Sequence, residues 1–159
     1  MSFDSVSFNL PHTPHALPLE ERIAALVESG RFVSVNADGV QAFAAAPGDS
    51  VLLLTADTRN NPESWDALIV LPEVLRAHAD ALRAAIVPPG EAAKVALRFG
   101  VRTYPAMVFQ RGGEYVGAIE GLQDWEAYVR LTEQMLAAPT SRAPSIGIAI
   151  VGPESGTCH

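Results

Sequence analysis

The sequence predicts an α/β fold, a three-layer arrangement in which helices lie on both faces of a central mixed sheet. Three observations lead to this prediction. Short apolar runs alternate with segments of helical periodicity, as in parallel strands joined by crossover helices. Two further strand-like runs flank a Gly-Gly turn, which is typical of an antiparallel hairpin. The length of 159 residues, with 48% hydrophobic and 18% charged residues, fits one compact domain with a tail.

Proline and glycine mark the first elements. Residues 1–17 contain two prolines and two histidines, and we expect an irregular arm there. Pro18 stands at the favoured first position of a helix whose apolar residues share one face and which ends at Gly30. The apolar run that follows predicts a strand over residues 32–35.

A buried strand and a kinked helix are predicted next. Asp38 is expected to cap a short helix over residues 40–45. The uninterrupted apolar run 51–56 is typical of a central strand that is covered on both faces. A polar loop then leads into a helix over residues 64–78. Pro72 should kink this helix, because proline removes a backbone donor and clashes with the preceding turn.

The second half of the chain continues the alternation and adds the hairpin. Residues 82–87 predict a strand that a Pro-Pro-Gly sequence ends. A helix is predicted over residues 91–99, with Gly100 as its stop signal. The hairpin strands are predicted over residues 106–110 and 115–119.

The last predicted helix begins at Asp124, which serves as its cap, and runs to residue 136. Trp125 and Tyr128 are expected to belong to the core. After this helix the composition changes to Pro, Ser, Gly and Thr, which is typical of a mobile tail. The predicted organisation is an arm over residues 1–17, a domain over residues 18–138 and a flexible tail over residues 139–159.

The formal net charge of −7 indicates which partners to expect. It opposes binding to nucleic acid, which requires clustered Lys and Arg. An acidic surface speeds encounter with basic peptides. The same charge also serves solubility, and by itself it favours neither interpretation.

Few residues in the chain are suited to redox chemistry or metal binding. The single cysteine, Cys158, cannot build a disulfide framework or a zinc site, and with His159 it is expected to lie in an exposed tail. His12 and His15 lie among prolines without two further ligands, which favours a flexible arm over a metal site. No metal or cofactor is predicted.

The ends of the chain also bear on its location. The N-terminal residues lack the basic segment and long apolar core of a signal peptide. The longest apolar stretch, residues 145–152, is too short to span a bilayer. The sequence therefore predicts a cytoplasmic protein with no direct membrane insertion.

From Val51 to about Leu136 the chain resembles thioredoxin. The features that carry this resemblance are the apolar strand 51–54, Pro72 in the following helix, the run from Phe99 to Pro105, the turn Arg111-Gly112-Gly113, and Gly121. The resemblance implies that Pro105 follows a cis peptide bond in a loop that holds an extended peptide. It also implies that Ser64 and Ala67 stand where thioredoxin has its two redox cysteines, and that its buried acidic residue falls near Leu54.

Disulfide exchange is excluded at this site on chemical grounds. The reaction needs a thiolate nucleophile, the Ser64 hydroxyl is far too basic to replace one, and Ala67 cannot act as the resolving group. Ser64 is interpreted as the cap of its helix rather than as a nucleophile. No histidine or second base follows it at a spacing that would complete a hydrolase site.

A more specific resemblance is to the HyaE/HupG family of hydrogenase expression proteins, which are thioredoxin-like and lack the cysteine pair. The ordered motifs are Leu52-Leu53-Leu54, Pro72-Glu73-Val74-Leu75, Arg98 to Arg102, Tyr104-Pro105-Ala106, Gly113 to Gly117, and Gly121 followed by Trp125. This resemblance implies a non-redox assembly chaperone for nickel–iron hydrogenase. Its expected partner is the hydrogenase small-subunit precursor, bound through the twin-arginine signal peptide. The alternative is a structural thioredoxin-like module that binds other hydrogenase accessory proteins.

The resemblance implies a peptide-binding site around the cis-proline loop. Its expected residues are Glu63, Ser64, Trp65, Asp66, Thr103, Tyr104, Pro105, Glu120 and Gly121. The backbone before the proline would pair with the peptide as an added strand. Trp65 and Tyr104 would be aromatic anchors, although packing of Trp65 into its own domain is equally compatible with the sequence.

Carboxylates on the rim of this expected groove suit the guanidinium groups of a twin-arginine motif. The acidic residues in question are Asp57, Glu63, Asp66, Glu73 and Glu120. An ordinary solvated acidic surface is the alternative interpretation for each of them. Taken together, they predict an acidic groove.

Overall fold

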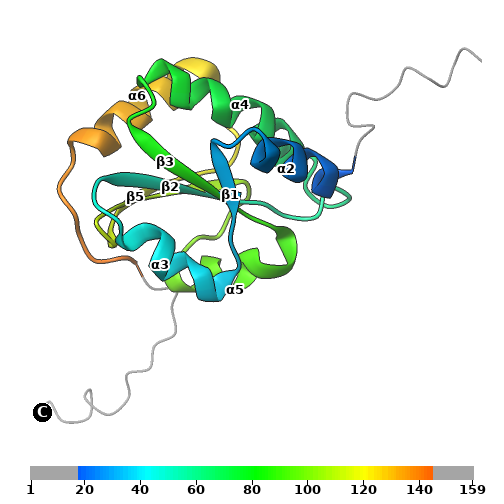
Figure 1. The fold of residues 1–159 in the computed structure, drawn as a ribbon, viewed down its shortest axis with the longest axis horizontal. Helices are drawn as coiled ribbons and strands as arrows, with labels where there is room; N and C mark the ends of the chain where they lie inside the picture. The colour runs from blue at the N-terminus through cyan, green and yellow to red at the C-terminus, as the bar shows by residue number, and fades with distance from the viewer. Residues whose placement is uncertain (1–17, 145–159) are drawn as a thin grey trace, which may run out of the picture.

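The computed structural model describes residues 18–144, and within this range it confirms the predicted α/β architecture. A five-stranded sheet with the order β1-β3-β2-β4-β5 has helices on both faces (Figure 1). The strands are β1 (Phe32–Ser34), β2 (Asp49–Leu54), β3 (Leu82–Val87), β4 (Ala106–Arg111) and β5 (Glu114–Glu120). The helices are α2 (Leu19–Glu28), α3 (Val40–Ala45), α4 (Glu63–Ala77), α5 (Pro89–Phe99) and α6 (Trp125–Ala137), with a 3-10 helix over Ala37–Gly39.

The sheet is mixed, as the sequence predicts. β1 and β2 both pair in parallel with β3, whereas β4 pairs antiparallel with β2 and β5. In this register Leu54, at the end of β2, pairs with Val87 at the end of β3 and with Ala106 at the start of β4. One edge of the sheet therefore gathers the loops β2–α4, β3–α5 and α5–β4.

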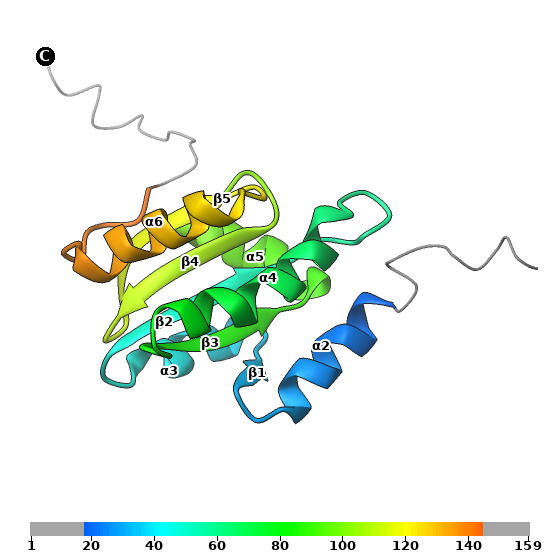
Figure 2. The same ribbon diagram turned by 90° about the horizontal axis from the view of Figure 1, so that it is seen from above.

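Two hydrophobic cores lie on opposite faces of the sheet, because successive side chains of a strand point to opposite faces. Leu53 belongs to the core beneath α2, α4 and α6, while its neighbours Leu52 and Leu54 belong to the core beneath α5. Figure 2 shows α2, α4 and α6 on one side of the sheet and α3 and α5 on the other. All three leucines are almost fully buried, which confirms β2 as a central strand.

Local signals placed the ends of several helices correctly. Asp124 accepts a hydrogen bond from Ala127 N at 2.8 Å and caps α6, as predicted. Gly100 ends α5 in the left-handed conformation with φ +70°. The predicted cap at Asp38 is wrong. Asn36 takes that role, because its Oδ1 accepts from Gly39 N at 2.8 Å and opens the 3-10 helix that precedes α3.

Of the two aromatic residues of α6 that were expected in the core, only one is buried. Tyr128 is 1% exposed and belongs to the core, as predicted, but Trp125 is 47% exposed. Both residues share a face by helical spacing, so periodicity alone placed them together. Trp125 is the first residue of α6, and the structure leaves it at the surface.

The described residues after α6 return along the hairpin (Figure 1). Ser141 N donates to Tyr115 O at 2.7 Å, and the Tyr115 ring stacks on Phe99 with centroids 5.9 Å apart. The carbonyl of Pro144 lies against Gly100 at the end of α5. We call residues 139–144 the C-terminal strap.

Arg111 ties the hairpin to the rest of the domain. Its Nε and Nη2 donate to the two Asp49 carboxylate oxygens at 2.9 and 3.0 Å. The same guanidinium donates to the carbonyl oxygens of Met135, Leu136 and Ala138 at the end of α6. A cation there also complements the negative end of the helix dipole.

Candidate functional site

The candidate site is built around the Tyr104–Pro105 peptide bond, which is cis, as the thioredoxin resemblance implied. This bond lies just before β4, at the sheet edge where β2 and β3 end. Pro105 is buried, Tyr104 is half-buried and Thr103 is exposed. The loop therefore presents backbone and side chains at the surface above a fixed proline.

The predicted residues Glu120 and Gly121 contact this loop directly. Glu120 Oε1 accepts hydrogen bonds from the backbone N–H groups of Arg102 and Thr103 at 2.8 and 2.9 Å. Gly121 N donates to Pro105 O at 2.8 Å. Gly121 has φ +82°, and a Cβ at this position would lie 3.6 Å from the Thr103 methyl group. Glu120 thus holds the loop in place with its carboxylate.

Ser64 reaches the loop through a residue that the sequence reasoning missed. The Ser64 side chain is fully buried, its Oγ donates to Asn61 Oδ1 at 2.7 Å, and it accepts from Ala56 N at 2.8 Å. Asn61 Nδ2 in turn donates to Tyr104 O at 3.0 Å. The expectation that Ser64 caps α4 is wrong, because Pro62 precedes the helix and Ser64 lies within its first turn.

Trp65 packs into its own domain. It is 8% exposed and belongs to the core shared by α2, α4 and α6, and the Arg22 guanidinium lies 5.9 Å from the centre of its ring. Of the two interpretations that the sequence left open, the structure supports the packing role. Ala67, at the second cysteine position of thioredoxin, is also fully buried.

Exposed apolar side chains follow Gly121 instead. Leu122 is 40% exposed and Trp125 is 47% exposed, so both offer apolar surface next to the glycine that contacts the cis-proline loop. The exposure of Leu122 could have been predicted from the sequence. This apolar residue lies in a loop between a strand and a helix, so it belongs to no amphipathic face that would bury it.

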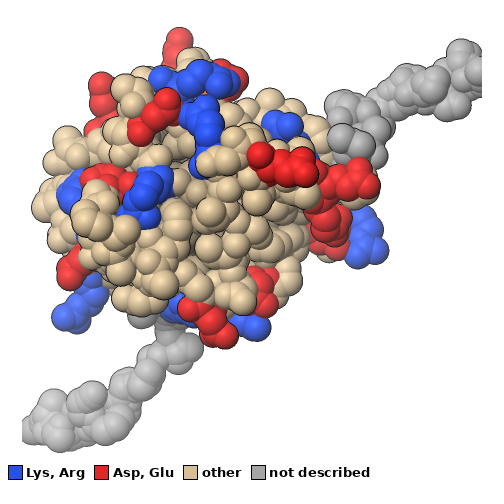
Figure 3. Space-filling model, in the orientation of Figure 1, with Lys and Arg blue, Asp and Glu red and all other residues tan. Residues whose placement is uncertain are grey.

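The predicted acidic residues occupy different environments. Glu63 is exposed and Asp66 is half-buried in the first turn of α4, where the helix dipole favours negative charge. Glu73 pairs with Arg76 on the same helix. Asp57 pairs with Arg59 in the β2–α4 loop. In Figure 3 acidic side chains gather on the side of the molecule where α2 begins, with a basic side chain beside them.

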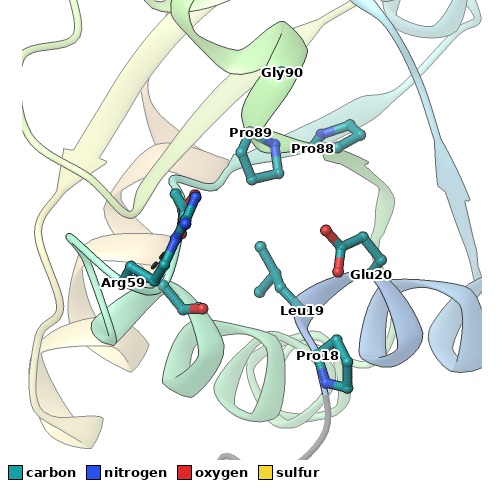
Figure 4. Close-up of a pocket in the computed structure, with 9 residues that line it drawn as sticks. Pro18, Leu19, Glu20, Arg59, Pro88, Pro89 and Gly90 are labelled. Atoms are coloured by element: carbon teal, nitrogen blue, oxygen red, sulfur yellow. Dashed lines mark hydrogen bonds and ion pairs between the residues drawn. The ribbon is translucent and has the colours of Figure 1, made fainter.

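A pocket of about 520 Å³ opens beside these loops (Figure 4). Its lining comes from the start of α2, the β2–α4 loop and the start of α5, as Pro18, Leu19, Glu20, Asp57, Thr58, Arg59, Pro88, Pro89 and Gly90. Figure 4 shows Arg59 and Glu20 on opposite sides, with Pro88 and Pro89 along a third. A second pocket of about 410 Å³ shares Asp57, Pro89 and Gly90 with the first and extends to Tyr104.

Hydrogen bonding fixes the charge of Asp57. The Arg59 guanidinium, which donates to both carboxylate oxygens, lowers the pKa of the Asp57 carboxyl from its usual 3.8 to about 2. Burial raises the pKa of the Tyr104 phenol. Near neutral pH the pockets therefore combine an ionised carboxylate with a neutral aromatic ring.

Within residues 18–144 no three His, Cys, Asp or Glu side chains are placed to hold a metal ion. The described range does not include the candidate metal or redox residues of the arm and tail, which are His12, His15, Cys158 and His159. In the described part of the chain, no helix is both long enough and apolar enough to cross a bilayer.

Comparison with known proteins gives consistent matches. The model of a protein family described as "Hydrogenase-1 expression protein HyaE" matches residues 23–128. The chain is 37% identical to the hydrogenase expression/formation protein HoxO of Cupriavidus necator over 164 residues, which cover 100% of both chains. It is 34% identical to the hydrogenase expression/formation protein HupG of Bradyrhizobium diazoefficiens over 102 residues, which cover 64% of this chain and 69% of that one.

The solved structures agree on the fold. A variant thioredoxin from Halobacterium salinarum aligns with a TM-score of 0.50 and 23% identity, covering 72% of this chain and 95% of that one. At this identity the likeness shows a thioredoxin-like fold and nothing about activity.

Proposed function

Because the chain belongs to the HyaE family of hydrogenase expression proteins, we propose that it serves in hydrogenase maturation as a chaperone without redox activity. The proposed partner is the hydrogenase small-subunit precursor, and the proposed ligand is its twin-arginine signal peptide. The proposal requires both proteins in the cytoplasm, where the precursor is made.

One observation supports this proposal: the site has the cis-proline loop, while Ser64 and Ala67 stand where thioredoxin has its two redox cysteines. The cis bond before Pro105 and the contacts from Glu120 and Gly121 give the loop a fixed shape. Ser64 and Ala67 are buried and carry no thiol. A site that retains its shape without a nucleophile is suited to binding rather than catalysis.

An extended peptide would meet the loop as an added strand. Within the described residues the Tyr104 N–H donates to no acceptor, whereas Tyr104 O accepts from Asn61. In this proposal Tyr104 N–H pairs with the peptide, and Ser64, Trp65 and Glu120 support the loop and helix from within. The exposed Glu63 at the start of α4, together with Asp66, supplies negative charge for the arginines.

The exposed pair Leu122 and Trp125 supports a second candidate function. Aromatic residues with this exposure are common at protein interfaces. They would allow the chain to bind another hydrogenase accessory protein as a structural module, without contacting the signal peptide.

Co-purification with the small-subunit precursor, with and without its signal peptide, tests the proposal. We expect the precursor to be retained by the wild-type chain and lost when the signal peptide is deleted. The double variant Glu63→Gln, Asp66→Asn should weaken retention of the full precursor. Asp80→Asn, at an exposed aspartate next to the start of β3, controls for the loss of one surface charge and should bind as the wild type does. Full retention without the signal peptide would contradict the proposal and favour the second candidate.

A further inference from the structure

Tyr104 belongs both to the cis-proline loop and to the wall of the pocket of about 410 Å³. The rest of that wall is Thr55, Ala56 and Asp57 after β2, and Pro89, Gly90 and Ala93 at the start of α5. Of the residues proposed above to bind peptide, Tyr104 is the one that lines it. The pocket is thus a separate space that a peptide lying along the loop can reach with one side chain.

Asp57 lines both this pocket and the adjoining pocket of about 520 Å³, and its carboxylate is held by the backbone of its own loop. Asp57 Oδ1 accepts from Arg59 N at 2.9 Å, and Asp57 O accepts from Asn60 N and Asn61 N at 3.0 and 2.8 Å. These bonds form a tight turn without the Arg59 guanidinium. We therefore expect the carboxylate to keep its position when that side chain is removed.

The Asp57 carboxylate binds a guanidinium group in the structure, that of Arg59. Its Nε lies 3.1 Å from Asp57 Oδ1 and its Nη2 lies 2.7 Å from Asp57 Oδ2. The Arg59 side chain is 86% exposed, so little besides this pairing holds it. By contrast, Arg111 is bound by Asp49 and by three carbonyl groups at the end of α6.

We propose that this pocket is a subsite for the guanidinium group of an arginine in the bound peptide, with Asp57 as its acceptor. Arg59 lines the adjoining pocket of about 520 Å³, and the peptide arginine would displace its guanidinium from the Asp57 carboxylate. This inference rests on the proposed peptide binding and assigns one arginine of the peptide to a defined place.

The pocket walls suit arginine better than other side chains. Ala56 and Ala93 offer small apolar contacts for the methylene groups, and Tyr104 offers an aromatic ring beside the cation. The start of α5 carries partial positive charge, which opposes a cation there. The full charge of Asp57 at hydrogen-bonding distance outweighs that partial charge. Lysine lacks the planar fork that engages both carboxylate oxygens.

Exchange of one arginine for another costs little. Exposed ion pairs of this kind are weak, because solvent screens them and two long side chains must be ordered. Removal of Arg59 should therefore strengthen peptide binding roughly two- to fivefold, since the competing cation is gone.

The test uses the full chain and a fluorescently labelled twin-arginine signal peptide, with affinity measured by fluorescence anisotropy. We expect Asp57→Asn to weaken binding roughly two- to fivefold, because it removes the charged acceptor of an exposed ion pair. Arg59→Ala should strengthen binding by the factor given above. A second peptide with lysines in place of both arginines should bind the wild-type chain more weakly, and Asp57→Asn should reduce that preference for arginine.

The Arg31–Asp80 ion pair provides matched controls, because it is also exposed but lies far from the site. Asp80 precedes the start of β3, whereas Asp57 and Arg59 lie where β2 and β3 end. Asp80→Asn and Arg31→Ala change the same charges and should leave affinity unchanged. If Asp57→Asn binds as Asp80→Asn does while the peptide still binds, the subsite is overturned and the chaperone proposal stands.

Failure of the wild-type chain to bind the peptide would instead count against the proposed function. In that case N-acetyl-arginine amide, titrated into the labelled chain and followed by NMR, decides the subsite separately. Shifts of the Asp57, Gly90 and Ala93 amides that Asp57→Asn removes would support it. Absence of those shifts at millimolar probe would overturn it.

Discussion

Gly100 offers a sharp test of how the C-terminal strap is held. A Cβ at Gly100 would lie 2.5 Å from Pro144 O, which is closer than real Cβ contacts, and φ is +70°. Gly30, just after the end of α2, has φ +85°, and a Cβ there would meet nothing within 4 Å. Alanine at Gly30 therefore measures the backbone cost alone, and alanine at Gly100 measures that cost plus displacement of the strap.

The magnitudes follow from these two environments. A left-handed conformation costs a residue with a Cβ about 1 kcal/mol, which is the loss expected for Gly30→Ala. In Gly100→Ala the Pro144 carbonyl must also move, and the hydrogen bond from Ser141 N to Tyr115 O is lost with it. A net hydrogen bond contributes about 1 kcal/mol. We expect Gly100→Ala to lower the free energy of unfolding by about 2 kcal/mol.

Urea denaturation followed by circular dichroism measures the two losses, and amide hydrogen exchange locates them. Exchange at Ser141 should accelerate in Gly100→Ala and stay unchanged in Gly30→Ala. Equal losses of stability in the two variants, with Ser141 equally protected, would refute the reasoning. That result would mean the strap contributes nothing measurable at this contact.

The Asp57–Arg59 and Asp49–Arg111 pairs give two further predictions. The pKa of Asp57 is about 2 in the fold and lies below its usual 3.8, so the pair stabilises the fold above about pH 4 and loses that contribution as the pH falls toward 2. An NMR titration of the Asp57 carboxyl carbon should give a midpoint of about 2, rising toward 3.8 in Arg59→Ala; identical midpoints would contradict the pairing. Arg111→Lys keeps the positive charge but loses the planar guanidinium that joins Asp49 to the end of α6. We expect it to lower the free energy of unfolding, measured by urea denaturation, by about 2 kcal/mol. A variant as stable as the wild type would show that the charge alone is sufficient.

Much of the fold could be predicted because its signals are local. Gly100 ends α5, Asp124 caps α6, and the Gly112-Gly113 turn closes the hairpin, each through a preference of a few neighbouring residues. The cis bond before Pro105 needed more than local chemistry. The prediction of this cis bond was correct because it came from the resemblance to thioredoxin, which implies the conformation of the surrounding loop.

The incorrect predictions have a different cause, because residue type and periodicity do not show which partner a side chain takes or where packing stops. Ser64 carries the residue type of a cap, yet its hydroxyl is used by Asn61 and Ala56. Trp125 has the spacing of a core residue, but periodicity does not show where along a helix the packing stops. The Asp57–Arg59 pair was within reach of the sequence, because an aspartate followed by a polar loop often bonds the amide two residues on.

The sheet separates the interior into two cores, and this bears on how the chain can change over evolution. Leu71 of α4 packs on one face and Val95 of α5 on the other, in different clusters. Substitutions at such distant, unconnected positions usually have additive effects on stability. One layer of helices can therefore drift in sequence without forcing compensating changes in the other, and the two faces are free to acquire different partners.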